Sequence, residues 1–449
     1  TKTMHSQTVK YISAEIQKCS LGESKFMGTN QDCPATAAKA VTGAVNTMTD
    51  KNPYSTSNNA VASFNSITGQ SYLYSFGGID STKTSSGIHQ RTFSMNFLSN
   101  SWTEIAPLPD TLGKIAMGAN CIGGKIYIIG GYHVFPNGNE ISSNKVHVFN
   151  PNLEVFEADG APIPVPIDDH VQCVYKDSLI FVVTGWSNTT NKADVQIYDP
   201  TLNQWTAGTS LPNNFNYKAF GASGYIIGDT LYYFGGVTSA SSFIARDYMR
   251  KGYINPNDPT DITWSTMTPA PGGAGYRSAC SASGQTVFWI GGASVGYNFD
   301  GIAYNGSGGV QPDTRILHLN SPSNSYQNNA SEPFGVMDLR GIGELGSGRW
   351  LICGGMDSNQ VVTNRTFLLT SPSLNLKEEK LKETFFISYT EIGVNVHSKE
   401  LMNYQLVSMD GKTLKTISLT ENWEIPFGDF PGGVYFIQTD NYSQKIILN

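Results

Sequence analysis

The chain has 449 residues, more than one ordinary hydrophobic core holds, so we expect two units or one large modular fold. Only 14% of the residues are charged, while glycine, tyrosine and phenylalanine are plentiful, which favours short strands and tight turns over long helices. The formal net charge of -7, with no clustered lysine and arginine, argues against nucleic acid as a partner, and no apolar run is long enough to span a membrane.

Residues 1–40 form an N-terminal extension that includes an alanine-rich run at 35–40. A repeat begins after it. Six apolar stretches end in glycine, five of them in a glycine pair, and they recur about every fifty residues, a period typical of propeller blades. They are residues 72–78, 126–131, 180–185, 231–236, 287–292 and 349–355.

Each repeat continues in the same way. An alternating strand such as 146–150 or 195–199 follows a loop of variable length, and a turn then leads to an aromatic residue. These aromatic residues are Trp102, Phe156, Trp205, Trp264 and Tyr326. Each repeat is therefore expected to supply four short strands.

This pattern resembles the kelch family of β-propellers over residues 41–372. The resemblance implies an all-β fold with a six-bladed propeller. The sixth repeat has a third strand at 366–369 but no fourth, so we expect residues 44–49, upstream of the first repeat, to complete that blade and remove its open edge. A seventh blade within residues 1–43 is the alternative.

The pattern stops near Ser371, and residues 373–384 form a charged linker. Residues 385–449 contain short alternating stretches separated by turns, which predict a small β-sandwich. This region resembles the type IX secretion sorting domain of Bacteroidetes, although the Pro-Asn-Pro box that usually opens that domain is missing. The matching residues are Asp410, Gly411, Lys412, Gly432, Gly433, Tyr435 and Lys445.

The resemblance implies export through the periplasm and the type IX translocon to the cell surface or the medium. A β-barrel carrier in the outer membrane is then the implied partner. A generic immunoglobulin-like module that binds carbohydrate or serves as a spacer is the alternative interpretation of this region.

Five polar residues precede the glycine-ended strands at similar distances: Lys114, His170, Lys218, Arg277 and Arg340. Because the inner strands of a propeller surround its axis, we expect these side chains to converge on one basic funnel that binds an anionic glycan or an acidic peptide. The alternative is that they form purely structural ion pairs with carboxylates such as Asp168, Asp169 and Glu344.

We therefore predict a binding protein for a glycan, a peptide or a surface protein, rather than an enzyme. Two alternatives stay open. One is a carbohydrate-active enzyme such as a sialic acid mutarotase, with Glu344 or Asp169 as the acid or base. The other is a component of the secretion or gliding apparatus. No zinc-ligand spacing and no phosphate-binding loop occurs, so we expect no metal and no cofactor.

Overall fold

The structure is a computed structural model that describes most of residues 45–370 and seven segments between 385 and 448. The described ranges are 45–48, 51–66, 70–239, 242–306, 309–329, 334–346, 348–370, 385–389, 393–398, 402–408, 412–419, 422–426, 428–439 and 442–448. The predicted extension 1–40 and linker 373–384 lie outside them.

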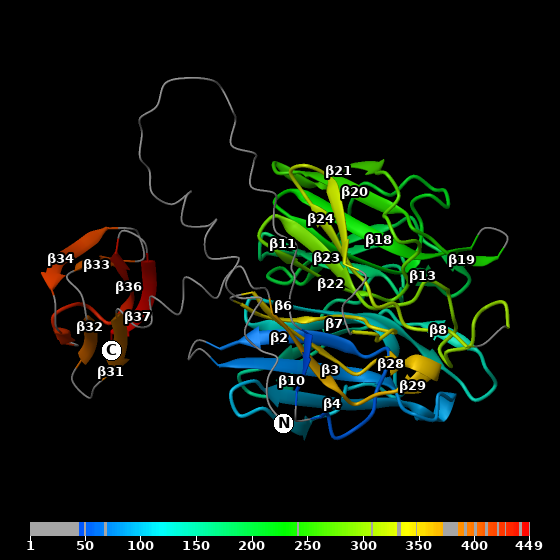
Figure 1. Cartoon of the computed structure of the whole chain (residues 1–449), viewed down its shortest axis with the longest axis horizontal. Coiled ribbons are helices and arrows are strands. Elements are labelled where there is room, and N and C mark those ends of the chain that lie inside the picture. Colours follow the sequence, from blue (N-terminus) through cyan, green and yellow to red (C-terminus); the bar gives the residue numbers. More distant parts are fainter. Residues whose placement is uncertain are drawn as a thin grey trace, which may run out of the picture. The chain divides into compact units, whose positions relative to one another are not determined.

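Strands dominate the described residues, which contain six antiparallel sheets of four or five strands between positions 45 and 370 (Figure 1). The first sheet is β2 (Ala60–Asn65), β3 (Ser71–Ile79), β4 (Ile88–Asn96) and β5 (Ser101–Ile105). The second is β6 (Ile115–Ile122), β7 (Lys125–Val134), β9 (Val146–Asn150) and β10 (Val155–Phe156), with β8 (Glu140–Ser142) added to β7. The third is β11 (Val171–Tyr175), β12 (Leu179–Val183), β15 (Val195–Asp199) and β16 (Gln204–Ala207).

The other three sheets repeat this order. The fourth is β17 (Phe220–Ile227), β18 (Thr230–Ser239), β20 (Met249–Asn255) and β21 (Asp258–Thr266), with β19 (Phe243–Ala245) added to β18. The fifth is β22 (Ala279–Ser283), β23 (Thr286–Ile290), β24 (Ile316–Asn320) and β25 (Ser325–Asn329). The sixth is β26 (Gly343–Gly346), β27 (Arg349–Cys353), β30 (Thr366–Thr370) and β1 (Val45–Thr47).

The strand β1 comes from the start of the described chain and pairs with β30, the last strand of the repeat region along the chain. Val45 faces Leu369 and Thr47 faces Phe367 in this pairing. The predicted completion of the sixth blade by residues upstream of the first is therefore confirmed. Because β1 completes the last sheet, the first and last parts of the propeller chain are joined, and β30 has no open edge.

Neighbouring sheets share buried apolar clusters around the whole cycle, and one such cluster also joins the sixth sheet to the first. The predicted aromatic residues lie on the outermost strands. Several of them donate hydrogen bonds to the preceding link or sheet, as Trp205 Nε1 does to the Ala161 oxygen at 2.7 Å and Trp264 Nε1 to the Thr209 oxygen at 2.8 Å. In four of the sheets the aromatic residue thus fastens the sheet to the one before it.

The glycine pairs lie where the end of the second strand of a sheet is closely packed against other backbone and side-chain atoms. In the second sheet, Gly131 has φ +82 and its N–H donates to the Ile167 oxygen of the segment that leads into the next sheet. A Cβ on Gly131 would lie 2.7 Å from the Ile115 oxygen and would also meet the Met117 side chain. Only glycine tolerates both the backbone angle and this contact. The recurrence of glycine at the end of the strand therefore has a steric cause.

The loops that follow the glycine-ended strands carry short extra strands, and these gather at one end of the propeller, on the right of Figure 1. They include β8, β19 and the two-stranded pairs β13 (Trp186–Ser187) with β14 (Thr190–Asn191) and β28 (Met356–Asp357) with β29 (Val361–Val362). We call this end the loop end. The tight hairpin turns lie at the opposite end, which we call the turn end.

The C-terminal region has two sheets. One contains β31 (Phe385–Tyr389), β32 (Gly393–Ser398) and β35 (Asn422–Pro426). The other contains β34 (Thr413–Leu419), β33 (Met402–Ser408), β36 (Gly433–Thr439) and β37 (Tyr442–Leu448). Val396 and Trp423 of the first sheet share one core with Leu406 and Ile437 of the second, so the region is a small β-sandwich, as predicted.

The helical segments of the described chain are 3-10 turns of three residues, η1 (Ser85–Gly87) and η2 (Ser358–Gln360), and neither is long enough to cross a membrane.

Candidate functional site

Six residues with left-handed backbone angles lie at the start of the six inner strands or just before it, and they surround the propeller axis. They are Asn58, Ala116, Asp169, Gly221, Arg277 and Asp338, with φ between +47 and +69. Backbone hydrogen bonds join them from sheet to sheet, such as Asp169 N–H to the Ala116 oxygen at 3.0 Å and Asn58 N–H to the Asp338 oxygen at 3.1 Å. At the step from Arg277 to Asp338, the donor to the Arg277 oxygen is the neighbouring Leu339 N–H. We call these six residues the axial ring.

Arg277 is the cation of the axial ring and is almost completely buried. Its Nε and Nη2 donate to the two oxygens of Asp169 at 3.0 and 2.6 Å, and its Nη1 donates to Asp338 at 2.8 Å. Burial alone would lower the pKa of Arg277, but the charges of Asp169 and Asp338 outweigh it and raise that pKa well above its ordinary value. Arg277 is therefore neutralised by the protein itself.

A pocket of about 250 Å³ lies on the axis and is lined by residues of all six inner strands or the segments leading into them. His170 and Arg340 line it close to the axial ring. Tyr225, Ser63 and Glu344 line it nearer the hairpin turns, where they are half-buried or exposed. The pocket therefore runs from buried polar groups toward the turn end.

Arg340 is the least compensated cation of this region. Its side chain is 4% exposed, its Nη2 donates to the His170 backbone oxygen at 2.8 Å, and its Nη1 lies 3.5 Å from an Asp169 oxygen that already accepts from Arg277. Its Nε has no hydrogen-bond partner among the described residues. Burial lowers the pKa of Arg340, as expected for a guanidinium without a carboxylate of its own.

His170 is buried beside Arg340 and hydrogen-bonds to Gln172 through Nε2 at 3.0 Å. Burial, assisted by the charge of Arg340, lowers the pKa of His170 to about 4, so the ring is neutral at physiological pH. Its Nδ1 has no partner in the described part of the chain. The inner end of the pocket therefore presents one charged donor and one neutral imidazole.

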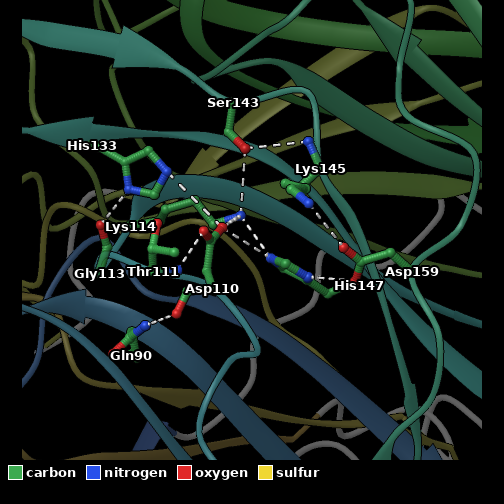
Figure 2. A network of polar contacts seen from close by, with 10 residues as sticks. All are labelled: Gln90, Asp110, Thr111, Gly113, Lys114, His133, Ser143, Lys145, His147 and Asp159. Carbon is green, nitrogen blue, oxygen red and sulfur yellow. Dashed lines mark hydrogen bonds and ion pairs between the residues drawn. The ribbon is translucent and has the colours of Figure 1, made fainter.

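Lys114 lies outside this pocket, within the polar network shown in Figure 2. Its ammonium group is fully buried and lies 3.0 Å from Asp110 Oδ2 and 2.8 Å from His147 Nε2. His147 Nδ1 in turn lies 2.8 Å from Asp159 Oδ1. Lys114 thus joins the link between the first two sheets to the second sheet, which is a structural role.

The five predicted ligand residues therefore separate into three groups. His170 and Arg340 line the axial pocket, Arg277 and Lys114 are held in buried ion pairs, and half-buried Lys218 is absent from the pocket lining. The alternative interpretation, structural ion pairs, holds for Asp169, which pairs with Arg277. Glu344 instead lines the pocket and forms no ion pair with a described cation.

Sequence reasoning missed the axial ring. Its members share a backbone angle but no side-chain chemistry, and of the six only Arg277 was predicted as a ligand residue, while Asp169 was named as a carboxylate beside the predicted funnel. Within the described ranges, no group of three or more histidine, cysteine, aspartate or glutamate side chains is placed to bind a metal ion.

Comparisons with known proteins agree with this architecture. Residues 42–236 match the family model of the KLHDC2/KLHL20/DRC7 Kelch-repeats domain. Kelch-like protein 36 of Bos taurus is 25% identical over 199 residues, which is 43% of this chain and 29% of the relative. Kelch-like protein 35 of Mus musculus is 26% identical over 144 residues, 32% of this chain and 22% of the relative. The chain thus spans less than a third of the length of these curated relatives.

A solved structure titled "Structure of YjhT" covers 78% of this chain and 99% of its own, with a TM-score of 0.56 and 15% identity. At that identity the likeness concerns the fold alone. Together with the glycine-ended strands, the outer aromatic residues and the closed cycle of sheets, these likenesses identify the all-β repeat region as a kelch-type β-propeller.

Proposed function

We propose that the chain is a secreted or cell-surface binding protein whose propeller holds an acidic group of a glycan or peptide in the axial pocket. The observation that carries this proposal is Arg340, a buried guanidinium that lines the pocket without a carboxylate of its own. A kelch propeller is a scaffold for binding and protein interaction, and function on such a scaffold depends on its sites.

The charges near the pocket argue for one binding cation rather than for a basic funnel of five. Asp169 and Asp338 already neutralise Arg277, and Asp110 neutralises Lys114. A carboxylate of a ligand would complete the partners of Arg340 through a charge-assisted hydrogen bond to its free Nε. The Arg340 side chain is 4% exposed, so little water surrounds it to weaken this contact.

The test is binding of the whole chain to arrays of acidic and neutral glycans and of acidic peptides. We expect an acidic class to bind and Arg340→Gln to weaken that binding at least about tenfold, the value of one charge-assisted hydrogen bond. Arg340→Lys, which keeps the charge, should lose less. Lys218→Ala is the matched control, because it removes a cation outside the pocket and should leave binding unchanged.

A thermal unfolding curve for each variant separates loss of the site from loss of the fold. The proposal is wrong if no acidic probe binds, or if folded Arg340→Gln binds as the parent does.

A second function, a sugar-acid mutarotase, is favoured by one observation. Glu344 lines the same pocket as Arg340, and the partial burial of its carboxyl group raises the pKa of Glu344, with an opposing hydrogen bond from Tyr225. A carboxyl group with a raised pKa is suited to proton transfer near neutral pH. Mutarotation of an acidic sugar that is lost in Glu344→Gln while binding persists would establish the enzyme.

The C-terminal sandwich is proposed to direct export through the type IX translocon and its β-barrel carrier to the outside of the cell. Of the predicted sorting residues, Asp410 and Gly411 lie outside the described ranges. Lys412 and Gly432 are exposed, Tyr435 is buried and donates to the Pro431 oxygen at 2.6 Å, and Gly433 and Lys445 lie on paired strands β36 and β37.

Export is tested in a bacterium that has the type IX system, by comparing the full chain with a chain that ends at residue 372. The full chain should reach the surface or medium and the shortened one should stay in the periplasm. Equal export of both would remove the sorting role and leave the spacer interpretation.

A further inference from the structure

The axial ring forms the floor of the axial pocket. Backbone hydrogen bonds join each inner segment to the next around the whole cycle, as Gly221 N–H donates to the Asp169 oxygen at 2.7 Å and Arg277 N–H to the Gly221 oxygen at 2.8 Å. The six ring residues are all buried. The residues that line the pocket follow the ring residues along the inner strands, on the side of the turn end.

The side chain of Arg277 fills the middle of the axial ring. It donates to Asp169, which leads into the third sheet, and to Asp338, which leads into the sixth. The third and sixth sheets lie opposite each other in a cycle of six, so a group that reaches both occupies the centre. The Arg277 side chain is 1% exposed, and the centre of the ring is therefore filled rather than open.

Two buried tyrosines cover the ring on the side of the loop end. The rings of Tyr276 and Tyr297 are centred 4.9 and 5.5 Å from the Arg277 Cζ. Tyr297 belongs to the loop that follows the fifth glycine pair, and its hydroxyl donates to Asp338 Oδ1 at 3.2 Å. The Tyr276 hydroxyl donates to the Tyr297 backbone oxygen at 3.2 Å. These contacts seal the ring, so a ligand reaches the pocket from the turn end.

The entrance at the turn end is narrowed by contacts between sheets. Tyr225 of the fourth sheet donates a hydrogen bond to the Glu344 carboxyl group of the sixth. Ser63 of the first sheet donates to the Glu344 backbone oxygen at 2.8 Å. The pocket volume of about 250 Å³ is below the roughly 300–1,000 Å³ of pockets that hold drug-sized ligands. The pocket therefore has room for one unit of a chain rather than for several.

The polar groups of the pocket suit a sugar. Every inner strand contributes a lining residue with a hydroxyl, amide or carboxyl group: Ser63, Asn120, Gln172, Ser223, Ser281 and Glu344. Hydroxyl and amide groups both donate and accept hydrogen bonds, as the hydroxyls of a sugar do. Polar groups on all sides match a ring that carries hydroxyls around its edge better than the end of a peptide, whose polar groups are confined to its backbone and one acidic side chain.

Resting on the proposed function, we infer that the axial pocket takes the terminal acidic sugar of a glycan, or a free sugar acid, and excludes chains in which the acidic sugar is internal. A chain that continues on both sides of its acidic unit needs two openings, and this pocket is closed at its floor. A terminal unit can bring its carboxylate inward to Arg340, whereas an internal unit is kept out by its neighbours. The position of the acidic sugar therefore decides binding, in addition to its charge.

The experiment measures binding of the whole chain to two pairs of oligosaccharides by isothermal titration calorimetry. One pair carries a uronic acid and the other a sialic acid. Each pair consists of a chain that ends in the acidic sugar and the same chain with one further neutral hexose capping that sugar. We expect a terminal form to bind and its capped form to bind at least about tenfold more weakly, because the charge-assisted contact with Arg340 is lost.

A matched pair of substitutions tests the direction of entry. Ser63→Trp places a bulky side chain at the turn end of the pocket and should weaken binding of the terminal form at least about tenfold. Ser242→Trp makes the same change at an exposed position in the loop that carries β19, at the loop end, and should leave binding within about twofold of the parent. Thermal unfolding curves identify a variant that has lost its fold, and the oligosaccharide pairs need no variant at all.

Equal binding of terminal and capped forms overturns the inference and leaves the proposed function in place. The same holds if Ser242→Trp rather than Ser63→Trp blocks binding, or if acidic peptides bind and acidic sugars do not. If no acidic probe of either class binds, the proposed function itself is wrong, and this inference is overturned with it.

Discussion

Asp110 is the residue whose charge fixes the network of Figure 2. Burial would raise its pKa, but the hydrogen bond with His147 and the charge and hydrogen bond of Lys114 hold that pKa well below its ordinary value. A carboxylate whose folded-state pKa is depressed stabilises the fold above its unfolded-state pKa of about 3.9 and loses that contribution as the pH falls further. The ion pair with Lys114 is therefore a source of acid sensitivity.

We predict that Asp110→Asn lowers the free energy of unfolding at pH 7 by about 3–5 kcal/mol, because it leaves the buried Lys114 without its carboxylate. The difference from the parent should shrink as the pH falls below about 4, where the unfolded carboxylate takes up a proton. Urea unfolding at several pH values measures both effects. A difference that is independent of pH would show that the charge of Asp110 is unimportant, and Asp261→Asn serves as the exposed control.

The sequence predicted which residues are cationic but not which of them reach the pocket. Spacing to the glycine-ended strands treated Lys114, Lys218 and Arg277 as equivalent. Arg277 is itself a member of the axial ring, whereas Lys114 and Lys218 precede the ring residues Ala116 and Gly221 by two and three positions. The axial ring itself was missed. Its left-handed angles occur at Ala116 as well as Gly221, and no local signal marks an alanine for that conformation.

Among the strands, those that end in glycine were predicted most accurately from the sequence. All six glycine-ended strands are present as β3, β7, β12, β18, β23 and β27, because the steric need for glycine recurs in every sheet. Inserted strands such as β8 and β19 were not predicted. They are short, lie in loops of variable length and carry no period, so only the contacts of the folded molecule define them.

Two glycines of the second sheet separate the contact from the backbone angle. Gly131 and Gly123 both have positive φ, but a Cβ on Gly123 would meet nothing within 4 Å, whereas one on Gly131 would meet Ile115 and Met117. We expect Gly123→Ala to cost about 1–2 kcal/mol through the backbone angle alone. Gly131→Ala should cost about 1–3 kcal/mol more through overpacking. Chemical unfolding of both variants measures the difference, and equal costs would contradict the steric explanation of the glycine pairs.

At the scale of the whole molecule, the propeller depends on one short strand that joins its two ends. The strand β1 completes the sixth sheet by pairing with β30, and the Met48 N–H donates to the Thr366 oxygen at 2.8 Å just beyond it. Without β1, the edge of β30 would present unpaired backbone groups that can pair with another chain. Closure should therefore control both stability and solubility.

We predict that removing residues 1–50, which deletes β1, lowers the unfolding midpoint and causes association that grows with protein concentration. The matched control removes residues 1–43 and keeps β1, so it should unfold and elute as the full chain does. Denaturant unfolding and size-exclusion chromatography measure the two effects. If the two truncated chains behave alike, β1 is dispensable and the contacts between the sixth and first sheets, such as Leu351 against Val61, suffice to hold the cycle closed. If only the shorter chain associates, the propeller is closed by β1, and residues far upstream of the first repeat belong to its last blade.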